Sequence, residues 1–163
     1  MTKKSKLLSL LLVLLLSVGV FAACSPADKP VDKKDDVKTE APADAKMQYI
    51  SPDDLKKDLE ADKYLILDLR KDADFKEGHI PGANPADLDV VVSGNDLEKG
   101  NEVIKKAIEA NDKPIVLVCY SGKKYAQAGT NALQALEQDL SKVYTLEGGM
   151  KAWTEKYPDD ITK

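Results

Sequence analysis

The stretch Ile115-Val116-Leu117-Val118-Cys119-Tyr120-Ser121-Gly122-Lys123-Lys124 is the part of the chain that decides its fold. Its first four residues are a short continuous apolar run, which is typical of a β-strand buried on both faces. A polar loop with a glycine follows, and a helical apolar pattern begins within the next few residues. We therefore expect Cys119 to open a loop that joins a buried strand to the start of a helix.

Two more apolar runs of the same kind occur at 64–67 and 143–146, with helical patterns between the runs. One helix is predicted to start at Ser51, a good N-cap residue, with Pro52 in the first helical position. Strands that alternate with helices predict an α/β domain with a central, mostly parallel β-sheet flanked by helices on both faces. Ligands of such sheets bind at the carboxyl ends of the strands, where Cys119 is expected.

The N-terminal region has the pattern of an export signal. Three lysines precede an almost unbroken apolar run over 7–20, which leads into Phe21-Ala22-Ala23-Cys24. This ending resembles a bacterial lipoprotein signal, so residues 1–23 are predicted to be removed and Cys24 to carry lipid. An uncleaved anchor is the alternative, because the apolar stretch is near the lower limit of about 17 residues for a spanning helix. Both alternatives export the domain and hold it on the extracytoplasmic face of the membrane.

Residues 24–46 are predicted to be the lipidated cysteine followed by a disordered tether. The segment is rich in charge and proline and has almost no large apolar side chains, so it cannot bury enough surface to offset its ordering entropy. The folded domain is then expected to span 47–163. The formal net charge of −4 argues against nucleic acid as a partner and leaves the lipid as the predicted membrane contact.

Cys119 is the candidate nucleophile. The chain has two cysteines, and a lipid on Cys24 would leave Cys119 without a disulfide partner. The N–H groups of the loop, the N-terminus of the following helix, and the ammonium groups of Lys123 and Lys124 all favour a thiolate, so we expect a lowered pKa for the Cys119 thiol. The alternative is an inert cysteine that ends a core strand, since free cysteines are often buried.

Three motifs are similar to those of the rhodanese (sulfurtransferase) family. The sequence Cys119-x-x-Gly122-x-Lys124 resembles the family's active loop, C-x-x-G-x-R. The LDLR and GHIPGA sequences within 67–83 resemble its D-x-R…F…GHIPGA signature, and 146–153 resembles its closing L-x-GG-x-x-AW element. The motifs occur in the family's order and cover most of the predicted domain, so the resemblance implies a rhodanese-like fold.

The resemblance implies a reaction that passes through a persulfide. Cys119 would attack the outer sulfur of a small anionic donor, thiosulfate or polysulfide, and the persulfide would pass this sulfur to cyanide or a thiol acceptor. The loop residues implied to bind substrate are Tyr120, Ser121, Gly122, Lys123 and Lys124. No metal and no organic cofactor are implied. The alternative is a persulfide carrier or redox-sensing binding module of the cell envelope, with little turnover of its own.

The loop departs from the family pattern at its basic position. Lys124 replaces the usual arginine and lacks the planar fork of that side chain, which leaves the identity of the donor open. A phosphatase or arsenate reductase is a third possibility. Phosphatase relatives have a longer loop, however, and their spacing from Cys119 would put Tyr125 at the arginine position, where it cannot bind phosphate with a guanidinium fork.

Three other conspicuous residues are assigned structural roles. The resemblance implies that His79, the one histidine of the chain, fixes the turn of the GHIPGA sequence through hydrogen bonds of its imidazole. A catalytic Cys–His pair with Cys119 is the alternative. Asp68 and Arg70 are predicted to organise the loops at the end of their strand. Arg70 is expected to pair with Asp74 or Glu77 as a loop clamp.

Overall fold

The computed structural model describes residues 43–163. The predicted signal sequence, the lipidated Cys24 and the predicted tether up to residue 42 lie outside the described residues.

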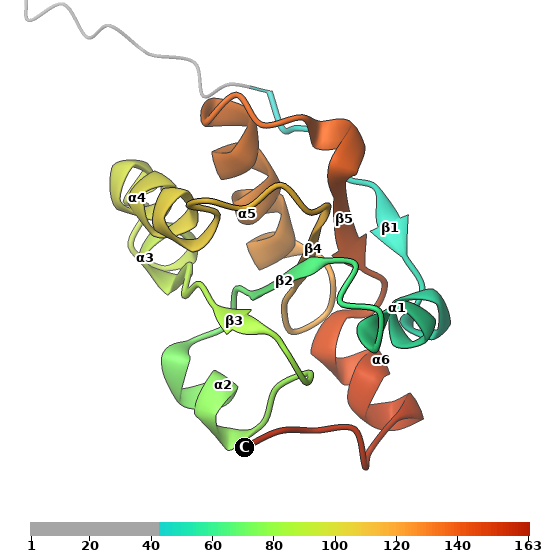
Figure 1. Cartoon of the computed structure of the whole chain (residues 1–163). Helices are drawn as coiled ribbons and strands as arrows, with labels where there is room; N and C mark the ends of the chain where they lie inside the picture. The colour runs from blue at the N-terminus through green and yellow to red at the C-terminus, as the bar shows by residue number, and fades with distance from the viewer. Residues whose placement is uncertain (1–42) are drawn as a thin grey trace, which may run out of the picture. The chain divides into compact units, whose positions relative to one another are not determined.

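Parallel strands form the sheet at the centre of the described domain (Figure 1). The strands are β1 (Tyr49–Ile50), β2 (Leu65–Asp68), β3 (Asn84–Pro85), β4 (Ile115–Val118) and β5 (Val143–Leu146). They lie in the order β1-β5-β4-β2-β3, and each neighbouring pair is parallel. The expected α/β class is therefore confirmed, and β4 occupies the middle of the sheet.

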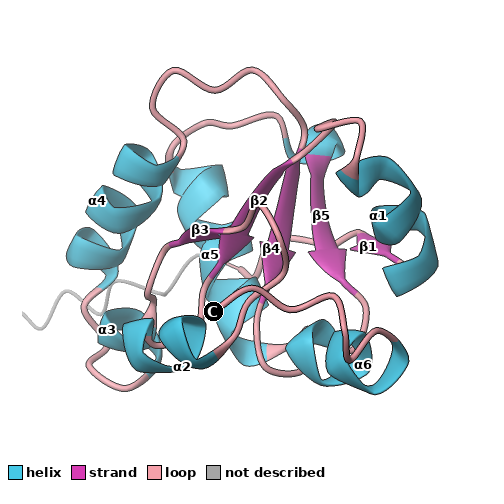
Figure 2. Cartoon of the chain, turned by 60° about the horizontal axis from the view of Figure 1, so that its bottom comes forward, coloured by secondary structure: helices cyan, strands magenta, loops and turns pink. Residues whose placement is uncertain are grey.

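Helices cover both faces of this sheet (Figure 2). They are α1 (Pro52–Leu59), α2 (Asp72–Glu77), α3 (Asp89–Val92), α4 (Leu97–Ala107), α5 (Lys124–Ala135) and α6 (Gly149–Lys156), with a 3-10 helix, η1 (Leu140–Lys142), before β5. Helices α3, α4 and α5 contribute to the hydrophobic cluster on one face of the sheet. Helices α1 and α6 contribute to the cluster on the other face.

The sequence of β4 shows why its apolar run is continuous. Leu117 packs in the cluster with α5, whereas Val116 and Val118 pack in the cluster with Trp153 of α6. All four residues of β4 are buried. Successive side chains of a strand point to opposite faces, so a strand covered on both faces needs an apolar side chain at every position.

The termini of the predicted elements agree closely with the structure. Ser51 caps α1, and its hydroxyl accepts a hydrogen bond from the Asp54 N–H at 3.2 Å. The strand predicted at 64–67 lies one residue later, because Asp68 is in register with Pro85 of β3. Strand β3 has only two residues and no sequence pattern of its own, so its pairing with β2 is what defines it.

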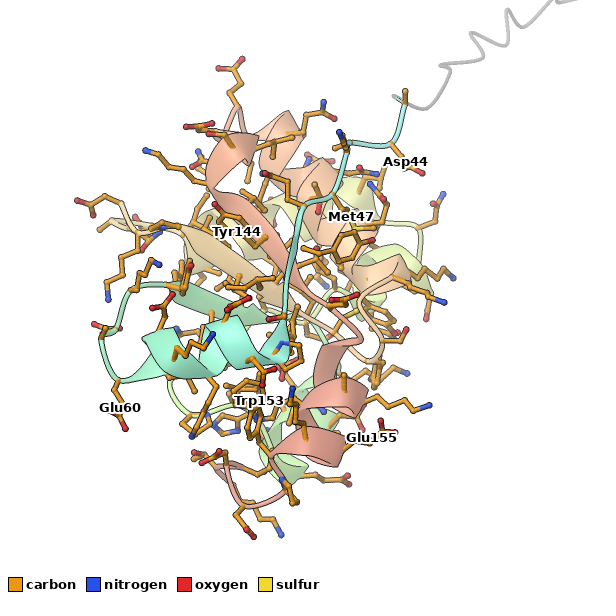
Figure 3. All side chains as sticks on the ribbon, turned by 90° about the vertical axis from the view of Figure 1, so that its right-hand side faces the viewer. Asp44, Met47, Glu60, Tyr144, Trp153 and Glu155 are labelled. Carbon is orange, nitrogen blue, oxygen red and sulfur yellow. The ribbon has the colours of Figure 1, made fainter. Side chains whose placement is uncertain are left out.

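The segment before β1 is bound to α5. The Ala45 N–H donates to Asn131 Oδ1 at 2.9 Å, and Gln127 Nε2 donates to the Ala45 carbonyl at 2.8 Å. Figure 3 shows Asp44 and Met47 on this segment. Asn131 also donates to Asp44 Oδ1 at 2.8 Å, so the packed structure includes the last residues of the predicted tether. No helix within residues 43–163 is both long and apolar enough to cross a membrane.

Candidate active site

Cys119 directly follows β4, at the carboxyl end of the central strand. It is a free thiol, only 2% exposed, in the hydrophobic cluster that also contains Leu69 and Ala126. The carbonyl of Cys119 accepts a hydrogen bond from the Met150 N–H at 2.7 Å, and the next carbonyl accepts one from the Lys151 N–H at 3.1 Å. The loop is therefore held by the start of α6 as well as by its own strand.

Two glycines let the Cys119 loop and the turn after β5 come into backbone contact. Gly122 has φ 68°, and a Cβ there would lie 2.7 Å from the Leu146 carbonyl oxygen. Gly149 has φ 60°, and a Cβ there would lie 2.3 Å from the Cys119 carbonyl oxygen. Both positions combine a positive φ with a close approach of backbone, so each needs glycine. Gly149 is the first residue of α6, so the turn into this helix packs directly on the Cys119 loop.

Alanine at position 149 is expected to destabilise the fold much more than alanine at Gly82. Gly82 also has a positive φ, 78°, but a Cβ there would meet nothing within 4 Å. Both substitutions put an alanine into left-handed backbone, which lowers the free energy of unfolding by about 1–2 kcal/mol. Gly149→Ala also overpacks the contact with the Cys119 carbonyl, which costs about 1–3 kcal/mol more. Urea unfolding of the two variants measures the difference. Equal losses would show that the contact with the Cys119 carbonyl is not a constraint.

The N–H groups of the loop are available to an anion. Those of residues 120–123 take no part in the turn, loop and cap hydrogen bonds found among residues 43–163. Helix α5 begins at Lys124, directly after them. Free N–H groups ahead of a helix N-terminus favour negative charge, so this arrangement suits a thiolate or a persulfide anion on Cys119. Among the described residues, no group of three His, Cys, Asp or Glu side chains is arranged to hold a metal ion.

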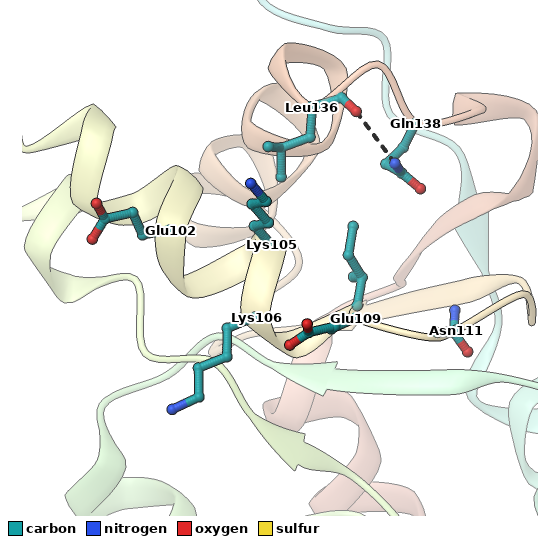
Figure 4. Close-up of a pocket in the computed structure, with 8 residues that line it drawn as sticks. Glu102, Lys105, Lys106, Glu109, Asn111, Leu136 and Gln138 are labelled. Atoms are coloured by element: carbon teal, nitrogen blue, oxygen red, sulfur yellow. Dashed lines mark hydrogen bonds between the residues drawn. The ribbon is translucent and has the colours of Figure 1, made fainter.

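Lys123 and Lys124 lie on the side of the loop that faces α3. Neither forms an ion pair among the described residues, and Lys124 Nζ donates to the Val92 carbonyl at 3.3 Å. Both lysines line a groove of about 840 Å³ with Val91 and Leu97. Figure 4 shows a separate depression, which is lined by Lys105 and other residues. It lies at the C-terminal end of α5, whereas the Cys119 loop lies at the N-terminal end of this helix.

Two tyrosines of the loop region form a contact that sequence reasoning missed. The rings of Tyr120 and Tyr125 lie 5.2 Å apart in an edge-on arrangement with a 70° angle between their planes. The Tyr120 hydroxyl donates to Asp74 of α2, and the Lys71 N–H donates to that hydroxyl at 3.4 Å. The Tyr125 hydroxyl donates to Asp89 Oδ1 of α3 at 2.7 Å. The tyrosines thus connect the loop to two different helices.

Burial and the neighbouring carboxylates raise the pKa of both phenols. Burial, together with the hydrogen bond to Asp74, raises the pKa of Tyr120 to about 12. Burial, together with the hydrogen bond to Asp89, also raises the pKa of Tyr125. The hydrogen bonds from Tyr125 and then Ser93 lower the pKa of Asp89. At neutral pH both hydroxyls are donors, and Asp89 is a charged acceptor.

The prediction that Asp74 or Glu77 pairs with Arg70 is wrong. Arg70 Nη2 contacts Asp68 Oδ2 at 2.7 Å, and Arg70 Nε contacts Asp68 Oδ1 at 3.0 Å. Both side chains are buried, and Arg70 Nη2 also donates to the Gly78 carbonyl at 2.7 Å. The pair organises the loops after β2, as expected, but its carboxylate is the residue two positions earlier. Asp74 is the partner of a tyrosine instead.

His79 is a structural residue, as predicted. Its Nδ1 lies 2.9 Å from the Phe75 carbonyl oxygen, and its ring stacks on the Phe75 ring with centroids 3.9 Å apart. The His79 backbone also exchanges two hydrogen bonds of 2.9 Å with Thr162, which ties the turn to the C-terminal segment.

The structure defines a class of α/β domains that are built around one thiol. In this class the central strand of a parallel sheet ends in a free cysteine, and a glycine-containing loop and a helix follow directly. The family model for the rhodanese-like domain matches residues 51–156, and this chain belongs to that family. It is 30% identical over 100 residues to the thiosulfate sulfurtransferase GlpE of Stutzerimonas stutzeri, a match that covers 60% of this chain and 76% of the relative. The corresponding protein of Pseudoalteromonas translucida is 28% identical over 105 residues, which cover 64% of this chain and 87% of the relative.

Solved structures share the fold at lower identity. The BH2092 protein of Bacillus halodurans superposes with a TM-score of 0.54 and 20% identity, over 71% of this chain and 76% of that protein. The arsenic–antimony reductase of Leishmania major superposes with a TM-score of 0.55 and 24% identity, over 71% of this chain and 85% of that protein. These likenesses concern the fold alone, and the rhodanese-like assignment rests on the family model.

Proposed function

We propose that this protein is a sulfurtransferase that moves sulfane sulfur through a persulfide on Cys119. The observation that carries the proposal is the position of the free thiol at the end of β4, beside a loop whose N–H groups are available to an anion. The family membership and the two relatives named thiosulfate sulfurtransferase support the same chemistry.

The reaction has two displacements at sulfur. The Cys119 thiolate attacks the outer sulfur of thiosulfate, the S–S bond of the donor breaks, and its electron pair leaves with sulfite. The persulfide anion then yields its outer sulfur to cyanide, which gives thiocyanate, or to a thiolate, which gives a new persulfide. The second step restores the Cys119 thiolate. The free loop N–H groups would stabilise the persulfide anion through hydrogen bonds to charge.

The test of the proposal is turnover by the full-length protein. Thiosulfate and cyanide are supplied, and sulfite and thiocyanate are measured separately. We expect equal amounts of the two products. Thiocyanate without sulfite, or neither product with thiosulfate, polysulfide or a thiosulfonate as donor, would contradict a sulfurtransferase mechanism.

A persulfide carrier is the second candidate, and the burial of Cys119 favours it. A thiol that is 2% exposed would hold a persulfide away from solvent and from adventitious thiols. Mass spectrometry of protein isolated from cells separates the candidates. A stable adduct of one sulfur atom on Cys119, combined with negligible turnover, would favour the carrier. An unmodified thiol with rapid turnover would favour the enzyme.

We further propose that Cys24 carries lipid and holds the domain on the extracytoplasmic face of the membrane. The support is the sequence pattern of residues 1–24. Replacing Cys24 with serine removes the only thiol that the lipid could use at that position, so we expect loss of labelling by radioactive palmitate and retention of the signal. Gels of the labelled protein measure both effects, because the palmitate label reports lipidation and the mobility of the band reports whether the signal is still attached. Continued palmitate labelling of Cys24→Ser would contradict lipidation at this site.

A further inference from the structure

The rings of Tyr120 and Tyr125 lie in contact with each other beside the Cys119 loop. Tyr120 follows Cys119 directly, and Tyr125 packs against the hydrophobic cluster that contains Cys119. The two rings are in edge-on contact at 5.2 Å. Because Cys119 is only 2% exposed, a donor has to displace a covering group before it can reach the sulfur.

Each ring is fixed by a carboxylate from a different helix. Asp74 of α2 accepts the hydrogen bond of Tyr120, and Asp89 of α3 accepts that of Tyr125 at 2.7 Å. Asp89 is held in turn by the Ser93 hydroxyl at 2.7 Å. The contacts of the ring pair therefore run from α2 across the loop to α3, and both anchors of this bridge are acidic.

We propose that the two tyrosine–carboxylate pairs form a cover on the Cys119 loop whose negative charge selects against dianionic sulfur donors. We call Tyr120, Tyr125, Asp74 and Asp89 the tyrosine cover. The proposal rests on the sulfurtransferase function and specifies its donor class: a sulfane compound with one negative charge or none. Tyr120 and Tyr125 act by closing the loop, and Asp74 and Asp89 act through their charge.

The cations of this region cancel only part of the charge of the cover. Arg70 is neutralised by Asp68 at 2.7 Å, and Asp74 forms no ion pair within residues 43–163. Lys71 Nζ lies 3.4 Å from Asp89, which offsets one carboxylate in part. Further acidic groups are close to the cover, since the Asp72 N–H donates to the Asp87 carboxylate beside it.

The two remaining loop cations are placed on the groove along α5. Lys124 donates to the Val92 carbonyl at 3.3 Å, and Lys123 lines the same groove. A donor that passes the ring pair on its way to Cys119 would come close to Asp74 and Asp89, because these carboxylates hold the two hydroxyls. Because Coulomb energy scales with the charge of the donor, a carboxylate near its path opposes a dianion twice as strongly as a monoanion.

Thiosulfate and methanethiosulfonate form a matched pair of donors for the test. Both present an outer sulfur on a tetrahedral sulfur, and in methanethiosulfonate a methyl group replaces one charged oxygen. Attack by the Cys119 thiolate breaks the S–S bond in each case. The leaving group is sulfite from thiosulfate and methanesulfinate from methanethiosulfonate, and the same persulfide anion remains on the protein. The donors thus differ in charge while the reaction stays the same.

The decisive variants are Asp89→Asn and Asp74→Asn, assayed with cyanide as the common acceptor. A charge acts twice as strongly on a dianion as on a monoanion, so we expect each variant to raise kcat/KM about fivefold for thiosulfate and about twofold for methanethiosulfonate. The gain should shrink as ionic strength rises. Asp112→Asn is the control, because Asp112 is exposed in the loop before β4, at the opposite end of that strand. Equal factors for both donors, or a change no larger than that of the control, would overturn the proposal.

A second measurement does not depend on turnover. Iodoacetamide is neutral and iodoacetate is an anion, and each alkylates a thiolate at its CH₂ carbon with loss of iodide. Alkylation is measured by mass spectrometry of the peptide that contains Cys119. We expect Tyr120→Ala and Tyr125→Ala to accelerate both reagents, and Asp89→Asn and Asp74→Asn to accelerate iodoacetate more than iodoacetamide.

The two measurements separate this proposal from the proposed function. Turnover with an unchanged preference between the donors refutes the tyrosine cover and leaves the sulfurtransferase function intact. Absence of turnover with both donors refutes the function, and the alkylation rates then decide on the cover. Rates that stay the same in all four variants refute it.

Discussion

Replacing Cys119 with serine is expected to abolish sulfur transfer. A serine hydroxyl is nearly isosteric with the thiol, so the buried site after β4 should keep its packing. An alcohol at neutral pH is neither a competent nucleophile toward sulfur nor able to hold a persulfide. By comparison with the loss of nucleophiles in other enzymes, we expect thiocyanate formation to fall by at least about 10⁴-fold. The measurement is the thiosulfate–cyanide assay, combined with urea unfolding to show that the variant is folded.

Cys24→Ser is the matched control for this prediction. It makes the same chemical change at the other cysteine of the chain, which lies outside the described domain. Purified Cys24→Ser protein should turn over thiosulfate at the rate of the unsubstituted chain. Activity retained by folded Cys119→Ser would show that the thiol is not the nucleophile. Equal loss in both variants would point to a disulfide or another shared role of the two cysteines.

Removing Arg70 is expected to cause a large loss of stability. The guanidinium binds both oxygens of Asp68 and the Gly78 carbonyl, and both side chains of the ion pair are buried. Arg70→Ala leaves a buried carboxylate without its partner, and such a change costs about 3–5 kcal/mol. Urea unfolding followed by Trp153 fluorescence measures the loss, because this side chain is fully buried in the core.

Two comparisons test the cause of that loss. The pair of Lys113 and Asp62 is exposed, so Lys113→Ala should lower the unfolding free energy by less than about 1 kcal/mol. The double variant Asp68→Leu, Arg70→Met removes both buried charges together and should be more stable than Arg70→Ala. A double variant that is less stable than Arg70→Ala would show that the pair acts through something other than compensation of buried charge.

The position of the candidate site followed from local sequence patterns. A strand buried on both faces needs an unbroken apolar run, and Ile115–Val118 supplies one directly before Cys119. The glycine at position 122 and the helix after it then place the cysteine in a loop at the carboxyl end of the sheet. These signals depend on neighbours in the sequence, so they can be read without knowledge of the remaining contacts.

The partners of the charged and aromatic side chains depended on the tertiary structure. Tyr120 and Asp74 are 46 positions apart, and Tyr125 and Asp89 are 36 positions apart. The chain has 28 acidic residues, and no periodic pattern marks which of them reaches a given hydroxyl. Arg70 shows the same limit. Asp74 and Glu77, its predicted partners, are near it in the sequence, but the folded chain pairs it with Asp68.

The sequence by itself thus determined the class of fold, the loop and its thiol, because apolar periodicity, a glycine and the cysteine at the end of a strand act over short distances along the chain. The tertiary structure alone decided what surrounds that thiol. It buries Cys119 to 2% exposure, places Lys123 and Lys124 on the groove along α5, and brings two carboxylates to the tyrosines beside it. Long-range packing determines these contacts, and through them the charge that a sulfur donor would meet.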